Sequence, residues 1–337
     1  MDQDKHILLT GGAGYIGSYL VGVLLRRGYL VTVVDELLYG GESLLAYKSD
    51  PNFCFIKGDV WESRVIRSSI PKEWAAPYAV IHLAGIEGFP ACQAVGRQVA
   101  WRYNVETTQH VYEQANELGV NRFIYLSSYS NYALPTTSSP ATEDSPLNPQ
   151  SLFAETQVAC ERYLQEHHDS KCTPLVFRLA SLYGISPRPR FDLVVNQFVI
   201  DAYRKRELMI YQRGYLRSFL HISDAAQGIL LGLRSQRDLI QGQVFNLGTG
   251  KGNLTKDEVV DLILKRLPET NIIYKDITFG GDMRDVSVSY HKIEQKLGFQ
   301  AELSVDDGIK EVLHALNSGL IHDPENHLYR NAQFVVQ

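Results

Sequence analysis

A glycine-rich turn near the start of the chain has the residue types and spacing needed to bind phosphate. The apolar run Ile7–Leu9 leads into Thr10–Gly17, where glycines stand at positions 11, 14 and 17. Glycine permits positive φ angles and lets the backbone approach a ligand closely. A helical pattern begins directly after the turn, so its unpaired N–H groups and positive dipole end would face the anion. We therefore predict diphosphate contacts at Gly11, Gly14, Tyr15, Ile16 and Gly17.

An acidic residue closes the next apolar run. Asp35 follows Val31–Val34 directly, and no arginine comes after it. A carboxylate at this point accepts hydrogen bonds from the ribose hydroxyls of an adenine dinucleotide and repels a 2′-phosphate. A glycine-rich turn alone can be a tight strand–helix connection, but here strand, turn, helix and acid all agree. We therefore predict that the cofactor is NAD, in preference to NADP.

The turn must lie between a strand and a helix, and this alternation continues through the first half of the chain. Strands are expected at His6–Thr10, Leu30–Val34, Phe53–Ile56, Ala79–Leu83, Arg122–Ser127 and Leu175–Leu179. Helices are expected at Tyr15–Arg27, Trp101–Leu118 and Ser151–His167. The alternation is typical of parallel βαβ units with helices on both faces of one sheet. The predicted fold is α/β, with a Rossmann-type, doubly wound parallel sheet.

The pattern changes from Gly184 onward, where strand patterns become fewer. Shorter helical segments are expected there at Asp192–Lys205, Lys256–Arg266 and Val305–Ser318. We predict an NAD-binding domain over 1–183 and a smaller, mainly substrate-binding C-terminal lobe over 184–330, with segments near 215–247 that return to the first domain. The returning strands are expected at Phe219–His221 and Val244–Leu247.

The composition excludes several classes of protein. The 337 residues are 45% apolar, and 33 Lys and Arg stand against 38 Asp and Glu, so the basic surplus of a general nucleic-acid binder is absent. Apolar runs such as Leu20–Leu25 are far shorter than the roughly 20 residues of a membrane helix. The start of the sequence leaves no room for a signal peptide, and the four cysteines form no C-x-x-C pair. We expect a cytoplasmic globular protein without a metal, membrane or nucleic-acid partner.

Further short motifs follow in a fixed order along nearly the whole chain. They are Gly58-Asp59-Val60, His82–Gly85, Asn104-Val105, Ser127-Ser128, Tyr132-Ala133, Arg217–Asp224, Phe245–Gly250 and Leu297–Phe299. With the G-x-x-G-x-x-G turn, the series resembles the extended short-chain dehydrogenase/reductase family, specifically its NAD-dependent nucleotide-sugar epimerases and dehydratases. The resemblance implies that NAD takes a hydride from a sugar carbon and later returns it. It also implies a homodimer packed through the helices around Trp101–Leu118 and Ser151–His167.

The resemblance assigns binding roles to individual residues. It implies cofactor contacts at Asp59, Val60, Leu83, Ala84, Gly85, Asn104, Ser127 and Gln157. It implies that Arg217 contacts the diphosphate of the sugar nucleotide, since a guanidinium matches phosphate oxygens. The family's second phosphate arginine falls on Phe279, for which Arg284 is a nearby substitute. Substrate contacts are also predicted at Ser181 and Arg190. Arg188 and Arg190, beside Pro187 and Pro189, could line the same cleft or equally be solvated.

The catalytic pair of the family is missing. Its Y-x-x-x-K motif falls on Phe153 and Gln157, in a register fixed by Glu143–Pro146 upstream and Glu161 downstream. In the family the lysine lowers the pKa of the tyrosine, whose phenolate takes the proton of a sugar hydroxyl. Phenylalanine has no proton to exchange and glutamine carries no charge. The usual mechanism therefore cannot run through these two side chains.

Other titratable side chains near the expected cofactor segments could supply the base. Tyr129 and Glu87 are the preferred candidates, with Ser128 as a hydroxyl donor. Tyr132 and His82 are further candidates that also fit structural packing. The eliminating members of the family carry an Asp-Glu pair where this chain has Tyr129 and Ser130. This difference disfavours the usual β-elimination and leaves epimerase-like or redox chemistry.

Two functions are open at this point. The first is an NAD-dependent nucleotide-sugar epimerase/dehydratase-like enzyme, an isomerase or lyase, that works by transient hydride transfer with an atypical acid/base set. Its catalytic site would contain Ser128, Tyr129, Glu87, Phe153 and Gln157. The alternative is a catalytically inactive regulator that binds NAD and a nucleotide sugar. A deliberate double substitution is a third explanation, but trapping a complex does not need both changes.

Overall fold

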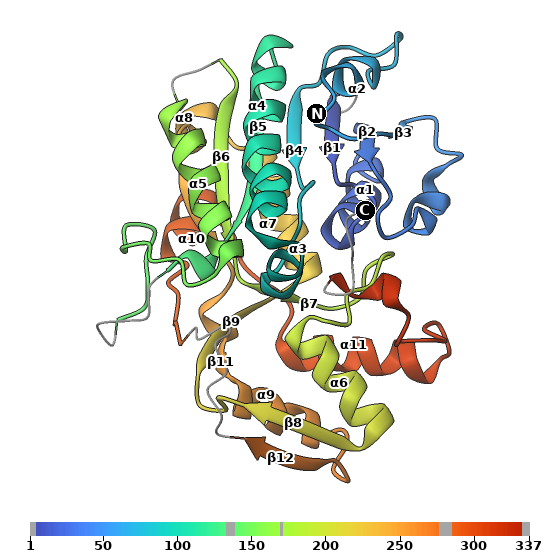
Figure 1. The fold of residues 1–337 in the computed structure, drawn as a ribbon, viewed down its shortest axis with the longest axis vertical. Helices are drawn as coiled ribbons and strands as arrows, with labels where there is room; N and C mark the ends of the chain where they lie inside the picture. The colour runs from blue at the N-terminus through green and yellow to red at the C-terminus, as the bar shows by residue number, and fades with distance from the viewer. Residues whose placement is uncertain (1–4, 133–138, 169–170, 276–284, 332–337) are drawn as a thin grey trace.

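A parallel sheet forms the larger of two lobes in the computed structural model, which describes residues 5–132, 139–168, 171–275 and 285–331 (Figure 1). Seven described strands pair in the order β10-β6-β5-β4-β1-β2-β3, and each neighbouring pair is parallel. They are β1 (His6–Thr10), β2 (Leu30–Asp35), β3 (Phe53–Lys57), β4 (Ala79–His82), β5 (Arg122–Ser128), β6 (Thr173–Leu179) and β10 (Val244–Leu247). The strand order reverses between β1 and β4, the point at which doubly wound sheets bind ligands. The predicted fold class is confirmed.

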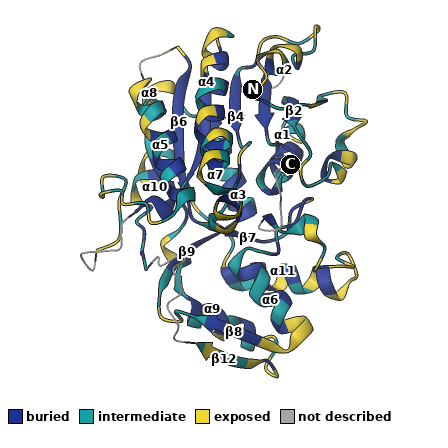
Figure 2. Ribbon diagram, viewed as in Figure 1, coloured by how far each residue is buried: buried dark blue, intermediate teal, exposed yellow. Residues whose placement is uncertain are grey.

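Helices cover both faces of this sheet. Successive strand residues alternate between two hydrophobic cores, so that Ile7 and Leu9 pack on one side and Leu8 on the other. One face is covered by α1 (Tyr15–Leu25), α7 (Ile222–Arg234) and α10 (His291–Leu297). The other is covered by α2 (Ser63–Ser68), α4 (Thr107–Glu117) and α5 (Leu152–Glu166). Figure 2 shows the buried strands between these partly exposed helices. A sheet enclosed in this way requires strands that are apolar on both faces.

The smaller lobe has its own core. Its helices are α6 (Val194–Lys205), α9 (Lys256–Leu264) and α11 (Val305–Asn317). Two small sheets accompany them: β8 (Glu207–Tyr211) with β12 (Asn271–Lys275), and β7 (Ser181–Tyr183), β9 (Leu216–His221) and β11 (Asn253–Thr255) in the order β11-β9-β7. This lobe lies below the carboxyl ends of the large sheet in Figure 1. A cleft for a ligand can therefore form where the two lobes meet.

The returning segments correct one part of the domain prediction. Val244–Leu247 does return to the large sheet, as strand β10 beside β6. The prediction for Phe219–His221 is wrong, because this segment pairs with β7 at the register Ser181↔Phe219. A short apolar run reads the same whichever sheet it joins, and the partner β7 is only three residues long. Helices α7 and α10 return to the larger lobe, since Ile222 and Ile293 belong to its core.

The helical segment before α4 is longer than predicted. Helix α3 (Phe89–Trp101) was not expected from the sequence, and a π-helical turn η2 (Arg102–Glu106) joins it to α4. Pro90 lies in the first turn of α3, and Gly96 interrupts it at φ +78°. These two residues break the apolar periodicity by which a helix is recognised. The remaining short elements are η1 (Glu42–Tyr47), η3 (Tyr129–Asn131), α8 (Arg237–Ile240), η4 (Gly250–Gly252) and η5 (His327–Tyr329).

The described residues bear on two kinds of partner, a membrane and a metal ion. Among the helices found there, none has the length and apolar character that crossing a bilayer requires. The same residues contain no group of three His, Cys, Asp or Glu side chains placed to hold a metal ion.

Candidate active site

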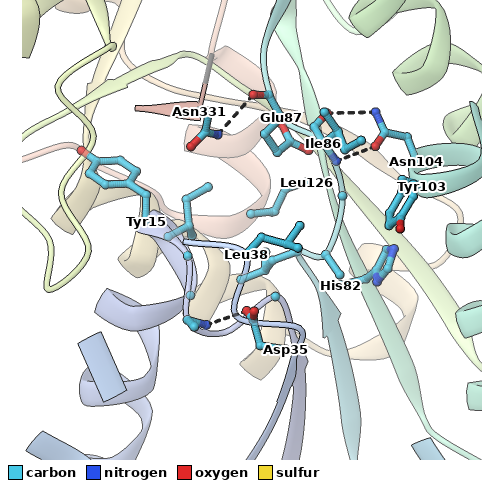
Figure 3. A pocket seen from close by; sticks show the side chains of 18 of the residues that line it. Tyr15, Asp35, Leu38, His82, Ile86, Glu87, Tyr103, Asn104, Leu126 and Asn331 are labelled. Atoms are coloured by element: carbon cyan, nitrogen blue, oxygen red, sulfur yellow. Dashed lines mark hydrogen bonds between the residues drawn. The ribbon is translucent and has the colours of Figure 1, made fainter. Parts of the chain in front are cut away.

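A cavity of about 240 Å³ opens at the carboxyl ends of β1, β2, β4 and β5, on the side of the sheet that faces the smaller lobe (Figure 3). It is lined by every residue for which the sequence predicts a cofactor contact: Gly11, Gly14, Tyr15, Ile16, Gly17, Asp35, Asp59, Val60, Leu83, Ala84, Gly85, Asn104, Ser127 and Gln157. These residues come from five different strand ends and the helices that follow them. The crevice expected from the strand order is thus present, with the predicted residues around it.

The glycine-rich turn lies where neighbouring backbone leaves no room for a side chain. Gly11 has φ +70°, and a Cβ added there would come within 2.6 Å of the Leu83 and Ala84 backbone. A Cβ at Gly17 would come within 2.5 Å of the Gly12 Cα atom. The N-cap of α1 is Gly14, and no side chain caps this helix end. The first N–H groups of α1 therefore face the cavity, as a diphosphate site requires.

Asp35 closes the other side of the turn. Its Oδ2 accepts a hydrogen bond from the Ala13 N–H at 2.9 Å, and its Oδ1 accepts one from the Leu37 N–H at 2.7 Å. Burial raises the pKa of this carboxyl, while the two N–H donors lower it. The side chain is thus held rigidly at the edge of the cavity, where ribose hydroxyls can donate to it. The cavity fits NAD at both the diphosphate and the ribose.

Asn104 fixes the loop that follows β4. Its Oδ1 accepts from the Ile86 N–H at 2.7 Å, and its Nδ2 donates to the Ile86 carbonyl at 3.1 Å and to Thr156 Oγ1 at 3.1 Å. The residue sits in the π-helical turn η2, a conformation that often occurs at functional sites. Asn104 therefore positions the wall formed by Leu83–Glu87 and connects that wall to α5.

A smaller cavity of about 160 Å³ continues from the far end of the large one. Both cavities are lined by Glu87, Ser128, Phe153, Ala180, Arg190 and Leu193. The smaller one adds mainly hydroxyl groups, from Tyr129, Ser130, Ser151 and Ser181. The shared residues stand where the reacting ends of a cofactor and a sugar would meet. Phe153, at the tyrosine position of the missing catalytic pair, is one of these shared residues, while Gln157, at the lysine position, lines the large cavity.

Glu87, which lines both cavities, has a strongly shifted pKa. Burial raises its pKa to about 7, although the charge of Arg190 and a hydrogen bond with the Gln157 side chain act to lower it. The Gln157 Oε1 atom in turn accepts a hydrogen bond from the Tyr125 hydroxyl at 2.8 Å. Gln157, which stands at the lysine position of the family motif, therefore holds the Glu87 carboxyl by a hydrogen bond.

Comparison with known proteins identifies the family. A model of the NAD dependent epimerase/dehydratase family matches residues 7–248, more than half of the chain. The chain belongs to this family. The dTDP-glucose 4,6-dehydratase of Actinoplanes sp. is 30% identical over 321 residues, covering 91% of this chain and 96% of the relative. The UDP-glucose 4-epimerase of Bacillus subtilis is 26% identical over 327 residues, covering 89% and 94%.

Solved structures agree with this assignment. The UDP-glucose 4-epimerase of Thermotoga maritima, solved with UDP-glucose, superposes with a TM-score of 0.81 at 26% identity and covers 94% of this chain and 99% of its own. The dTDP-glucose 4,6-dehydratase DesIV of Streptomyces venezuelae, solved with NAD, has a TM-score of 0.80 at 26% identity, with coverages of 93% and 98%. Membership confirms NAD as the cofactor of the family. The relatives catalyse two different reactions, so membership alone does not fix the chemistry.

Two of the side chains predicted as possible bases are held by hydrogen bonds to other protein side chains. His82 lies between Thr10 Oγ1 at 2.6 Å and Thr108 Oγ1 at 3.1 Å, and burial lowers its pKa to about 3. Its imidazole is therefore neutral at physiological pH. The Tyr132 hydroxyl donates to Asn246 Oδ1 at 2.5 Å and accepts from Arg178 Nη1 at 3.0 Å, and Tyr132 lines neither cavity. Both ring nitrogens of His82, which lines the large cavity, are thus engaged by threonine hydroxyls, and the Tyr132 hydroxyl is engaged by Asn246 and Arg178.

The other candidates lie at the site. The Ser128 Oγ atom accepts hydrogen bonds from the Ser130 N–H at 3.1 Å and from the Ser130 hydroxyl at 2.7 Å. The hydrogen of the Ser128 hydroxyl is therefore not used in the contacts with Ser130. The Tyr129 hydroxyl is 3.2 Å from Ser181 Oγ and lines only the smaller cavity. Phe153 lines both cavities and packs in an apolar cluster around Ile86.

The predicted substrate residues are dispersed. Ser181 and Arg190 line the smaller cavity, and Arg190 forms an ion pair with Asp192 at 2.7 Å. Arg217 is buried on β9 and lines neither cavity. Arg284 lies outside the described residues. The structure thus brings two of the four predicted contacts to one cavity.

Sequence reasoning missed two residues of one wall of the large cavity and left the role of a third open. Tyr39, Arg188 and Asn331 line it from three distant segments. Asn331 donates from its Nδ2 to the Glu87 carbonyl at 3.2 Å, as Figure 3 shows. No family motif marks these residues, and the final segment of the chain has no recognisable pattern. Only the two arginines of the Pro-Arg-Pro-Arg stretch gave a signal, which left their role open.

Proposed function

We propose that this chain changes a nucleotide-activated sugar by transient oxidation, with Glu87 as the group that takes up and returns the hydroxyl proton. Bound NAD would supply the hydride acceptor and donor. The observation that carries the proposal is the position of Glu87, which lines both the cofactor cavity and the smaller cavity. Tyr129, the other preferred candidate, lines the smaller cavity alone.

The electrostatics of Glu87 suit this role. A carboxyl whose pKa lies at about 7 is half ionised near neutrality, so it can accept a proton and give it back. While a sugar carbinol is oxidised, the Glu87 carboxylate would take up its O–H proton. When the carbonyl is reduced again, the Glu87 carboxyl would give the same proton back to the oxygen. Gln157, which is fixed by Tyr125, keeps the carboxyl in position throughout.

The polar groups favour epimerisation or simple oxidation over loss of water. Elimination needs a second acid near the leaving hydroxyl. Glu87 is the only carboxylate among the described residues that line the smaller cavity. Ser130, at one of the positions where eliminating members carry an acid, donates instead to Ser128. Ser128, Ser130, Ser181 and Tyr129 would orient sugar hydroxyls.

Substitution of Glu87 tests the proposal. The purified chain with NAD is incubated with UDP, dTDP, GDP and CDP sugars, and NADH absorbance and the product sugar are followed. Glu87→Gln should lower turnover by about 10²- to 10⁴-fold, the usual contribution of a general base, while NAD affinity is retained. Unchanged turnover in this variant would refute the assignment, and wild-type protein that changes none of the sugars would favour the regulator.

Glu155→Gln is the matched control. Glu155 lies on α5 two residues from Phe153, and its exposed side chain pairs with Arg97 at 2.6 Å. Its replacement makes the same chemical change outside both cavities. Turnover of this variant should equal that of the wild type.

We further propose, from the family resemblance, that the enzyme acts in the cytoplasm as a homodimer packed through α4 and α5. The two helices lie side by side on one face of the large sheet. Sedimentation of the purified protein tests the dimer, and fractionation of cells tests the location. A monomer at micromolar concentration, or protein recovered with membranes, would contradict the corresponding part.

A further inference from the structure

Arg188 has hydrogen-bonding capacity that nothing in the described chain uses. Only 4% of the residue is exposed, and its side chain lines the large cavity. The Nη1 atom donates to Asn331 Oδ1 at 2.8 Å. The Nε and Nη2 atoms are buried, and neither has a hydrogen-bond partner among the residues that the structure describes. Buried donors are normally paired, so two open ones on one guanidinium edge indicate a ligand.

The charge of Arg188 is also unbalanced. No described carboxylate forms an ion pair with it, because the neighbouring Asp192 is engaged by Arg190 at 2.7 Å. Burial and the charge of Arg190 lower the pKa of Arg188 to about 10, so the side chain stays cationic at neutral pH. Tyr39 stacks on the guanidinium with 4.1 Å between the charged carbon and the ring centroid. The other groups with a charge interaction at this point are Asp35 and Asp192. A buried cation with no paired anion favours an anionic ligand.

The loop that carries Arg188 is attached to the helix end that faces the cavity. The Arg188 N–H donates to Ser18 Oγ at 3.2 Å, and Ser186 Oγ donates to the Tyr15 carbonyl at 2.6 Å. Tyr15 and Ser18 belong to the first turn of α1, and Gly14–Gly17 at this helix end line the cavity. The guanidinium and the start of α1 therefore border one space from two sides.

We infer that Arg188 binds the diphosphate of the cofactor through Nε and Nη2, across from the amino end of α1. The Nε–Nη2 edge of a guanidinium matches two phosphate oxygens in a fork. The diphosphate of the sugar nucleotide fits less well, since Arg190 lines the smaller cavity and Arg188 does not. A 2′-phosphate also fits less well, because it would meet the Asp35 carboxylate. The inference depends on cofactor binding and not on the proton chemistry of Glu87.

Asn331 is the positioning residue for this arginine. Its Oδ1 holds the Nη1 of Arg188, its Nδ2 holds the Glu87 carbonyl, and its N–H donates to Asp192 Oδ2 at 3.2 Å. These three contacts join the end of the described chain to both walls of the cavity. With Nη1 engaged by Asn331, the opposite edge of the guanidinium is left for the ligand.

Calorimetry with fragments of the cofactor tests the inference. The full chain, freed of bound nucleotide, is titrated with adenosine, ADP, ADP-ribose, NAD and NADP. Arg188→Met should weaken binding of ADP, ADP-ribose and NAD by about 10- to 100-fold, the usual effect of losing hydrogen bonds between charged groups. Adenosine, which has no phosphate, should bind within about twofold of wild type if the fold is intact. Arg97→Met, on the exposed face of α3, is the control and should change nothing.

The remaining outcomes decide the matter. Equal losses for adenosine and ADP would show a structural role, and unchanged ADP affinity would show no role; either overturns the inference. A larger loss for NADP than for NAD would place Arg188 at a 2′-phosphate and also overturn it. Arg188→Lys should recover part of the ADP affinity. Asn331→Ala should weaken ADP binding in the wild type but have no further effect in Arg188→Met, because it acts through the arginine.

Discussion

The two ends of the large cavity follow the family pattern to different degrees. At the diphosphate and ribose end, Gly11, Gly17 and Asp35 stand as the motifs predict, and the backbone geometry at both glycines excludes a side chain. At the other end, Phe153 and Gln157 replace the catalytic pair, and Glu87 shares their space. The difference shows that binding phosphate through the backbone restricts residue type more strictly than proton transfer does. Close approach of backbone to phosphate admits few residue types, whereas a proton can be moved by any group in reach with a suitable pKa.

Restoring the family pair in the Glu87→Gln background gives the sharpest contrast between the two ends. Phe153→Tyr with Gln157→Lys supplies a phenol and a cation at the positions where the family has them. Turnover should rise by about 100-fold over Glu87→Gln alone, because general base catalysis is regained. Steady-state kinetics at saturating NAD measure the gain. A triple variant that is folded and binds NAD but shows no gain would mean that Glu87 does not stand in for the pair.

The pH dependence should also separate the ends. On the proposed function, the oxidising direction needs the Glu87 carboxylate, so kcat should rise about tenfold per pH unit below the pKa and level off above it. With a pKa of about 7, the slope should appear between pH 5 and pH 7. Glu87→Gln should lack this slope, while NAD affinity of both proteins stays level over the same range.

Folding stability should fall as the pH rises, opposite to the rise expected for kcat. The pKa of the Glu87 carboxyl is about 7 in the folded state and has the ordinary value of 4.5 in the unfolded state. The folded state therefore binds this proton more tightly. Protonation therefore favours the fold, and stability declines as pH rises from about 4.5 through 7. Urea unfolding at pH 5 and pH 8 should show Glu87→Gln gaining stability relative to wild type at the higher pH. Parallel curves for the two proteins would contradict a raised pKa.

A substitution at the ribose end should have the smallest effect on the chemistry. Asp35→Asn keeps the size of the side chain but offers one acceptor oxygen where two N–H donors now bind. NAD should bind about tenfold more weakly, and discrimination against NADP should shrink because the repelling charge is gone. Turnover at saturating NAD should change less than about threefold, since the site of proton transfer is untouched. A fall in kcat as large as the loss of affinity would mean that the two ends are coupled.

The regular elements of the larger lobe were largely predictable. The first six strands were expected within one or two residues at each end, because a strand buried on both faces is a continuous apolar run bounded by turn residues. Helix α3 was missed, since Pro90 and Gly96 interrupt its periodicity. Phe219–His221 was assigned to the wrong sheet, because pairing partners are chosen by long-range packing.

The candidate site divides in the same way. The cofactor residues from Gly11 to Gln157 were found from motifs, because each motif is a short contiguous segment whose residue types are set by its own contact with the ligand or the neighbouring backbone. Tyr39 and Asn331 could not be found, and Arg188 could not be assigned to the cleft or to solvent, because these roles exist only when distant segments meet. The two base candidates His82 and Tyr132 were separated from Glu87 only by their hydrogen-bond partners and burial.

The sequence by itself determined that the amino-terminal half binds a dinucleotide, and that the usual proton carrier is absent. Both conclusions rest on residue type at fixed spacing: a glycine is required wherever a side chain would collide with neighbouring backbone, and a phenyl ring has no proton to give. Tertiary structure alone decided which titratable group lies where the two cavities meet, and that the guanidinium of Arg188 borders the large cavity. The acidity of a carboxyl and the pairing of a cation depend on what surrounds them, and those surroundings come from segments up to 244 positions apart in the chain.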